Sequence, residues 1–139
     1  MNPNRYPLIS IITVVYNCKD DLEMTIKSII DQTYPNIEYI VIDGNSNDGT
    51  IDIIKKYQNK ITYWISEPDE GIYDAMNKGI RQSTGDWINF MNAGDRFYDQ
   101  NILSSLFIPV PKPSTDIIYG DTEFIYTFGK YIRKPASLT

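Results

Sequence analysis

Apolar residues along this chain alternate between short compact runs and longer stretches in which they recur at helical spacing. The first run, LISIITVVY at 8–16, is almost unbroken and rich in β-branched residues, which predicts a strand buried on both faces. Shorter runs at 37–42, 61–65 and 87–91 predict three more strands, and DIIYG at 116–120 predicts another. Because its run is the longest, 8–16 is expected to form the central strand.

Helical periodicity fills the intervals between these runs. Within 20–32 the apolar side chains recur at spacings of three and four residues, the pattern of a helix with one buried stripe. The same reasoning predicts helices at 51–57, 71–82 and 101–107. Phe128-Gly129 then predicts the turn of a hairpin.

Strands that alternate with helices at this spacing predict right-handed βαβ units. We therefore expect an α/β fold with a mainly parallel sheet, helices on both faces and a C-terminal β-hairpin. The 139 residues, of which 42% are hydrophobic, suffice for one core, so residues 1–139 are interpreted as a single domain. Ligands of such sheets bind beyond the carboxyl ends of the strands.

The residue inventory removes several kinds of chemistry. The sequence has no histidine, which excludes Ser/His/Asp triads and imidazole metal sites, so acid–base and metal chemistry must rest on carboxylates. The single cysteine, Cys18, has no partner for an internal disulfide. Eighteen acidic against 13 basic residues argue against a nucleic-acid partner, because phosphate neutralisation needs clustered lysine and arginine.

Hydropathy also bears on location. No stretch approaches the ~20 apolar residues of a membrane span, and the amino terminus, MNPNRYP, lacks the apolar core of a signal peptide. We therefore expect a cytoplasmic protein with no membrane span.

Polar residues gather where the predicted strands end. The four segments are Tyr16-Asn17, Asp43–Ser46, Glu67–Asp69 and Asn92–Asp95. Because carboxyl ends of parallel strands meet at one edge of a sheet, these segments are expected to share one crevice. An aromatic ring, fixed carboxylates and small residues suit a nucleotide whose diphosphate is bridged by a metal. Asp, Asn and Gly also simply form turns, and for any single segment this alternative stays open.

Four ordered motifs carry a more specific resemblance. ISIITVVYN, IDGNSNDGT, EPDEGIYDAMNKGI and TGDWINFMNAGD, in this order and spacing, resemble the nucleotide-binding half of a family 2 glycosyltransferase with the Rossmann-like GT-A fold. The match covers about 8–100, which would be the nucleotide-sugar-binding core, and 101–139 would begin the acceptor side. DIIYGD and the hairpin after it resemble the subgroup that builds bacterial cell-surface polysaccharides.

The resemblance implies nucleotide-binding roles for the matching positions. Val14 falls where the family contacts the base through its backbone, Tyr16 where it stacks on the base, and Asp43 where a carboxylate hydrogen-bonds the base. A uracil ring presents an N–H donor to such a carboxylate. The full set is Val14, Tyr16, Asp43, Ser46, Asp69, Gly71 and Asn77. For Asn77 the alternative of an ordinary helix surface residue stays open.

The NAGD segment stands where the family has its acidic metal motif. The resemblance implies that Asp95 coordinates Mg²⁺ or Mn²⁺ and that Asn92, Ala93 and Gly94 line the donor-sugar position. Asn92 and Gly94 replace acids found in many members, so we expect metal to bind weakly without nucleotide. Asp86 precedes the same strand and is expected to be a surface or capping residue.

The family's general base lies well beyond the metal motif, and no residue of this chain matches it, so we expect it beyond Thr139. Asp121 and Glu123 fit a strand and turn more easily than a catalytic base. A donor-binding half of this kind is expected to leave apolar surface uncovered, which favours a homo-oligomer. Lys130, Arg133 and Lys134 either meet an anionic lipid carrier or form a solvated edge, and the solvated edge is favoured.

The resulting hypothesis is an inverting glycosyltransferase of hexosyl or N-acetylhexosaminyl type. It would transfer sugar from a nucleotide-sugar donor, a UDP-sugar, to a saccharide or lipid-linked acceptor with metal assistance. The alternative is a catalytically incomplete nucleotide-sugar-binding module. A receiver-type signalling domain fits less well, because receivers need an acidic pair after the first strand, where this chain has Tyr16-Asn17.

Overall fold

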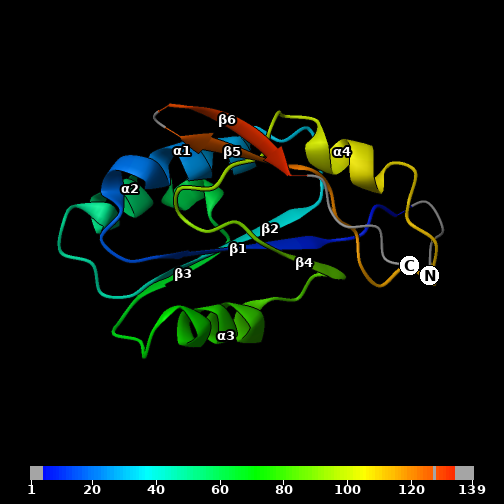
Figure 1. Cartoon of the computed structure of the whole chain (residues 1–139). Helices are drawn as coiled ribbons and strands as arrows, with labels where there is room; N and C mark the ends of the chain where they lie inside the picture. Colours follow the sequence, from blue (N-terminus) through cyan, green and yellow to red (C-terminus); the bar gives the residue numbers. More distant parts are fainter. Residues whose placement is uncertain (1–4, 127, 134–139) are drawn as a thin grey trace.

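A four-stranded parallel sheet forms the centre of the computed structural model, which describes residues 5–126 and 128–133 (Figure 1). Its strands stand in the order β3-β2-β1-β4, and all of them are parallel. They are β1 (Ile9–Val15), β2 (Ile37–Asp43), β3 (Tyr63–Ser66) and β4 (Trp87–Phe90). Every residue of β1 is buried, because it has a strand on each side and helices over each face. The expected α/β fold with a mainly parallel sheet is confirmed.

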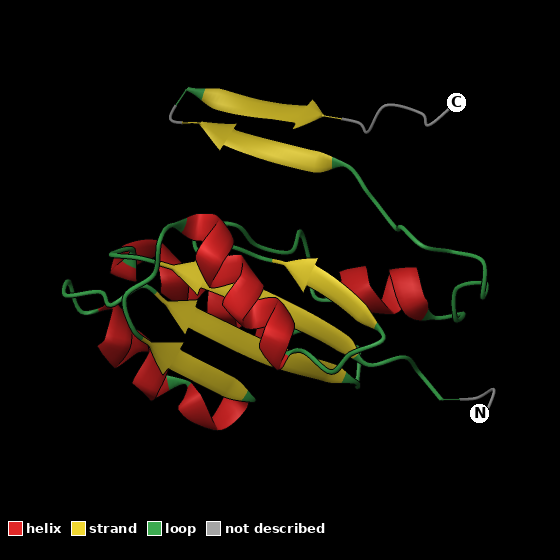
Figure 2. Cartoon of the chain, turned by 90° about the horizontal axis from the view of Figure 1, so that it is seen from below, coloured by secondary structure: helices red, strands yellow, loops and turns green. Residues whose placement is uncertain are grey.

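Helices cover both faces of this sheet, as the sequence predicts. They are α1 (Lys19–Ile30), α2 (Thr50–Lys56), the 3₁₀ helix η1 (Gln58–Lys60), α3 (Ile72–Gln82) and α4 (Ile102–Phe107). Figure 1 shows α3 below the sheet and the other α-helices above it, and Figure 2 shows α3 lying across the lower face. None of the helices in the described ranges is both long and apolar enough to cross a membrane.

The core divides into two layers because side chains of a strand alternate between its faces. On β1, Ile9, Ile11 and Val15 pack with residues of α1, α2 and α4, whereas Ile12 and Val14 pack with α3. A Cβ on Gly79 would collide with Ile12. Glycine therefore lets α3 lie directly on the central strand, which brings the amino end of α3 close to the carboxyl edge of the sheet.

The carboxyl-terminal part differs from the prediction in one place. The run at 116–120 forms no strand; only Ile118 packs against the core, while Ile117 and Tyr119 are 70% and 52% exposed. Three apolar residues favour a strand only where a sheet edge offers hydrogen bonds, and this segment pairs with none. The predicted hairpin is confirmed over β5 (Thr122–Tyr126) and β6 (Gly129–Arg133), with Tyr126 paired to Gly129. It stands apart from the four-stranded sheet (Figure 2).

Candidate functional site

The strand order places a topological switch point next to β1. From β1 the chain runs outward to β2 and β3, then returns to add β4 on the other side of β1. In open parallel sheets the ligand crevice lies outside the carboxyl ends of the two strands at such a point. Tyr16 follows β1 and the segment Asn92–Asp95 follows β4, so both stand at this crevice.

The ends of β1, β2 and β3 come together around Gly44. A Cβ on Gly44 would lie 2.7 Å from Oδ2 of Asp69 and 3.4 Å from Cδ2 of Tyr16. Tyr16 is 66% exposed, so its ring is free to stack on a planar ligand. The structure thus brings together Tyr16 and Asp69, two of the residues predicted for nucleotide binding, and the absence of a side chain at Gly44 makes room for them.

Asp43 has more hydrogen bonds than the sequence indicated. Its carboxylate is fully buried and accepts from the backbone N–H of Ser46 at 3.0 Å, from the Ser46 hydroxyl and from the Ser66 hydroxyl at 2.6 Å. Ser46 Oγ in turn accepts from the backbone N–H of Asn17 at 2.8 Å. This chain of bonds ties together the ends of β1, β2 and β3, and it gives Asp43 a structural role that sequence reasoning missed, together with its partner Ser66.

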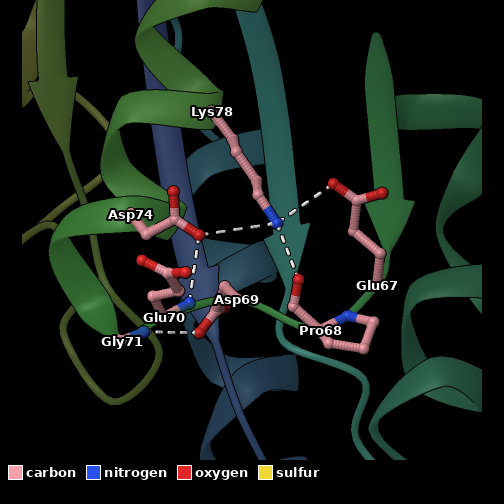
Figure 3. A network of polar contacts seen from close by, with 7 residues as sticks. All are labelled: Glu67, Pro68, Asp69, Glu70, Gly71, Asp74 and Lys78. Atoms are coloured by element: carbon pink, nitrogen blue, oxygen red, sulfur yellow. Dashed lines mark hydrogen bonds and ion pairs between the residues drawn. The ribbon is translucent and has the colours of Figure 1, made fainter.

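The connection between β3 and α3 positions Asp69 and Gly71 (Figure 3). Asp69 Oδ1 accepts from the backbone N–H of Gly71 at 3.0 Å, and Gly71 has a φ of 112°, which disfavours other residues. Lys78, from the second half of α3, reaches back to Glu67 at 3.0 Å and to the carbonyl of Pro68 at 2.9 Å. The hydrogen bond with Glu67, supported by the charges of Asp74 and Asp69, raises the pKa of Lys78.

The turn after β4 is held through its backbone. The hydroxyl of Thr25, a fully buried residue of α1, donates to the carbonyl of Asp95 at 2.7 Å and accepts from the N–H of Gly94 at 3.0 Å. The Ala93 N–H donates to the carbonyl of Val14 at 3.3 Å. The carbonyl of Val14 therefore links β1 to the turn after β4. Asp95 itself is exposed, so its carboxylate is open to solvent.

Asn92 contributes an atom with unused hydrogen-bonding capacity. Its Oδ1 is buried and has no hydrogen-bond partner among the residues that the structure describes. Buried polar atoms are nearly always paired, so this oxygen is suited to accept from a ligand or to face a cation. It lies in the same turn as Asp95, three positions before it.

Asn77 lies on the face of α3 that points away from the sheet. It is exposed on α3, and its helical position is opposite Ala75 and Gly79, which are buried against the sheet. Its assignment as a nucleotide contact stays a prediction, with the surface interpretation favoured by its position.

The fit of a divalent cation can be tested on the donor atoms present. Within residues 5–126 and 128–133 no three or more cysteine, aspartate and glutamate side chains are placed to hold a metal ion. Asp95 with the free Oδ1 of Asn92 offers the oxygen ligands that Mg²⁺ accepts, since that ion is usually bound by one or two carboxylates together with substrate phosphates and water. The residues fit a cation that arrives with a diphosphate.

Asp86 lies at the opposite edge of the sheet, as predicted. It is exposed, and its carboxylate accepts from the backbone N–H of Leu8 at 2.8 Å. Of the basic cluster, Lys130 pairs with Glu123 at 3.1 Å, Arg133 is exposed, and Lys134 lies outside the described residues.

Curated relatives of the chain are glycosyltransferases. It is 41% identical over 99 residues to an uncharacterized glycosyltransferase of Mycobacterium tuberculosis, covering 70% of this chain and 38% of that one. It is 35% identical over 120 residues to a PGL/p-HBAD biosynthesis glycosyltransferase of Mycobacterium bovis (83% and 46%). It is 30% identical over 142 residues to the putative teichuronic acid biosynthesis glycosyltransferase TuaG of Bacillus subtilis (98% and 56%). The chain thus spans about half the length of these relatives or less.

Solved structures share the fold. The mannosyltransferase PcManGT from Pyrobaculum calidifontis, in complex with GDP-Man and Mn²⁺, superposes with a TM-score of 0.71 at 23% identity, covering 81% of this chain and 34% of that one. S. aureus TarS 1-349 in complex with UDP-GlcNAc gives 0.65 at 24% identity (70% and 29%). Both are GT-A glycosyltransferases, which confirms the expected GT-A fold.

The family assignment rests on most of the chain. The family model described as glycosyl transferase family 2 matches residues 10–136, well past the segment in which the four motifs lie. Together with relatives up to 41% identical, this match shows that the chain belongs to glycosyl transferase family 2.

Proposed function

We propose that this chain binds a nucleotide-sugar donor, a UDP-sugar, at the carboxyl edge of the sheet and serves an inverting, metal-assisted transfer of a hexosyl or N-acetylhexosaminyl group. The observation that carries the proposal is the convergence of Tyr16 and Asp69 at Gly44, across the switch point from the Asp95 turn. An exposed ring, a fixed carboxylate and an open cation ligand are the three groups that a base, a ribose and a diphosphate require. The complexes of PcManGT with GDP-Man and of TarS with UDP-GlcNAc support this choice of ligand class.

The chain's own residues have distinct tasks in this proposal. The Tyr16 ring stacks on the base, Asp69 accepts from ribose hydroxyls, and Asn92, Ala93 and Gly94 border the donor sugar. Asp43 reaches the base by an exchange of donors, in which the N–H of the base replaces the Ser66 hydroxyl. Ser46, which Asp43 and Asn17 hold in place, keeps the turn after β2 beside the base.

Asp95, with Oδ1 of Asn92, would hold a divalent cation, Mg²⁺ or Mn²⁺. Such a cation, when bound with the diphosphate, acts as a Lewis acid that neutralises negative charge on the leaving nucleoside diphosphate. The chain's contribution is to fix the turn rigidly through Thr25, so that the exposed carboxylate stands at the switch point. Because Thr25 is fully buried, its two hydrogen bonds hold the turn whether or not a ligand is bound.

The acceptor in this proposal is a saccharide or a lipid-linked molecule. The residues that activate it are assigned to the part of the relatives that lies outside the match. Among the acids near the carboxyl terminus, Glu123 forms an ion pair with Lys130 within the hairpin, which gives it a structural partner. The alternative of a nucleotide-sugar-binding module without transfer stays open at this point.

Calorimetric titration tests the proposal. UDP is expected to bind the wild-type chain more tightly than GDP, and Mn²⁺ to increase UDP affinity about tenfold or more, because the cation would neutralise charge on the diphosphate. In Asp95→Asn the metal enhancement should be mostly lost. The matched control is Asp31→Asn, which changes an exposed aspartate at the carboxyl end of α1.

Two results would count against the proposal: no binding of any uridine nucleotide, or an equal Mn²⁺ enhancement in Asp95→Asn and wild type. Efficient sugar transfer to a saccharide acceptor by this chain alone would rule out the module alternative and would place acceptor activation within the chain.

A further inference from the structure

The connection between β3 and α3 carries an unusual density of negative charge for a site that receives an anionic diphosphate. Glu67, Asp69, Glu70 and Asp74 fall within eight residues, and Lys78 forms ion pairs with two of them, Glu67 and Asp74. Lys78 has only 17% of its side chain exposed, which is low for a lysine on the outside of a short domain. The contacts of Lys78 with Glu67, Pro68 and Asp74 hold its side chain in this position.

Lys78 acts on the connection from two sides of Asp69. Its Nζ donates to the carbonyl of Pro68 at 2.9 Å, immediately before Asp69. It also lies 3.7 Å from Oδ2 of Asp74, the same oxygen that accepts from the backbone N–H of Glu70 at 3.0 Å, immediately after Asp69. Figure 3 shows Lys78 and Asp74 reaching toward the connection from α3. The backbone on both sides of Asp69 is thus tied to one helix.

The orientation of Asp69 follows from these ties. Its Oδ1 accepts from the N–H of Gly71, and its Oδ2 is directed at Gly44, where Tyr16 also lies. Without the positive charge of Lys78, the carboxylates of Glu67, Asp69 and Asp74 would repel one another, and the carbonyl of Pro68 would lose its donor. Gly71, whose φ is 112°, would allow the connection to adopt other conformations.

We propose that Lys78 is a positioning residue of the donor site, which holds the Pro68–Gly71 turn so that Asp69 faces the ribose of the nucleotide. This inference rests on the proposed function for its ligand, and on the contacts of Lys78 alone for its mechanism. Lys78 does not itself touch the nucleotide in this arrangement, because Glu67, Pro68 and Asp74 occupy its ammonium group.

The first measurement requires no nucleotide. Backbone amide exchange of the peptide 67–74 is compared in the wild type, Lys78→Met and Lys56→Met. Lys56 is the matched control, because it also pairs with a glutamate, Glu23 at 2.6 Å, but belongs to α2 on the other face of the sheet. Exchange at Glu70 and Gly71 is expected to accelerate about tenfold or more in Lys78→Met and to stay at the wild-type rate in Lys56→Met. Equal exchange in both variants would overturn the proposal.

The second measurement uses discrimination between UDP and its 2′-deoxy and 3′-deoxy analogues, each titrated with Mn²⁺. The wild type is expected to prefer UDP over at least one deoxy analogue by about tenfold, since a ribose hydroxyl donates to a carboxylate. In Lys78→Met this preference should fall to about twofold or less, while Lys78→Arg, which keeps the charge, should recover part of it. A variant that binds all three ligands more weakly but keeps the preference would show a merely general structural role and overturn the proposal.

The two measurements separate the two ideas. If amide exchange responds to Lys78→Met while the wild-type chain binds no uridine nucleotide, the proposed function fails and the positioning of the turn stands. If the wild type binds UDP and Lys78→Met keeps both its slow exchange and its ribose preference, the role of Lys78 fails and the proposed function stands.

Discussion

The two ends of the parallel sheet use the same residue types in opposite ways. At the amino end, Glu38 accepts from the Ser10 hydroxyl, from the Thr84 hydroxyl at 2.7 Å and from the Thr84 N–H at 2.8 Å. The hydroxyl of Ser10 accepts in turn from the N–H of Gly85 at 2.8 Å. The polar groups of this cluster satisfy one another.

At the carboxyl end the pairing is incomplete. Asp95 and Tyr16 are exposed, and Oδ1 of Asn92 is buried without a partner in the described part of the chain. Gly71 and Gly94 both have positive φ and open space where a Cβ would stand. The comparison teaches that a carboxylate near a strand end indicates a site only where its neighbours leave hydrogen-bonding capacity free. Asp43 is the exception, because it lies at the carboxyl end but its carboxylate is already hydrogen-bonded by Ser46 and Ser66.

That exception predicts the largest effect on stability. Asp43→Ala should lower the free energy of unfolding by about 3 kcal/mol, because it leaves the donors of buried Ser46 and half-buried Ser66 without their acceptor. Urea denaturation at neutral pH measures this change. Asp43→Asn, which keeps an acceptor oxygen, should lose less. An unchanged unfolding midpoint in Asp43→Ala would show that the carboxyl end does not depend on this network.

Replacing Glu38 should cause a smaller loss of stability and leave nucleotide binding unchanged. Burial raises its pKa, but hydrogen bonds from Ser10 and Thr84 outweigh this, and the pKa lies below the ordinary 4.5. A carboxyl group with a lowered folded-state pKa stabilises the fold above its unfolded pKa, and that contribution is lost as pH falls through its folded pKa. Glu38→Gln is therefore expected to cost about 1–2 kcal/mol at pH 7 and to flatten the acid limb of the stability curve below pH 4.5.

Glu23 provides an internal control for the pH experiment, and UDP binding provides the result that would contradict the prediction. Glu23, whose pKa is lowered to about 2 by hydrogen bonds from Lys56 and Tyr57, should still produce a loss between about pH 4.5 and 2 in the Glu38→Gln variant. UDP affinity of this variant should equal that of the wild type. If Glu38→Gln weakened UDP binding, the two ends of the sheet would not be separable.

Gly44→Ala should have the smallest effect, and it should lower UDP affinity rather than stability. The added Cβ would stand 2.7 Å from Oδ2 of Asp69, the end of a flexible side chain that can move at little cost to the fold. We expect UDP affinity to fall about fivefold, or about 1 kcal/mol, with the free energy of unfolding changed by less than about 0.5 kcal/mol. Gly120→Ala, in open space, is the control. If Gly44→Ala lowered stability and left UDP affinity unchanged, the space at Gly44 would serve the fold and not nucleotide binding.

The periodic pattern of the sequence was sufficient for the sheet and its helices, because burial on both faces leaves a strong apolar signal in β1 and β2. The same pattern predicted a strand at 116–120 that does not form. Its apolar residues resemble those of a strand, but the segment has no neighbouring strand among the described residues to pair with. The convergence of Tyr16 and Asp69 could be predicted from strand ends alone. They follow β1 and β3, which flank β2 in one parallel sheet, so both strands end at the same edge.

Other parts of the site could not be predicted, because they depend on contacts between distant residues. Thr25 is 70 positions from Asp95, and Ser66 is 23 positions from Asp43, and neither has a sequence pattern of its own. Lys78 could have been noticed as the i, i+4 partner of Asp74. Its bond to the carbonyl of Pro68 depends on how α3 packs, and a sequence does not display that packing.

The position of β4 in the strand order also has a consequence for the order of folding. Contacts between β1 and β2 join residues 28 positions apart, and those between β2 and β3 join residues 23 apart, whereas those between β1 and β4 span 78. Closing the longest loop costs the most chain entropy, so β4 is expected to dock after the other three strands have paired. The nascent chain would therefore acquire the surroundings of Tyr16 and Asp69 before the turn that carries Asp95.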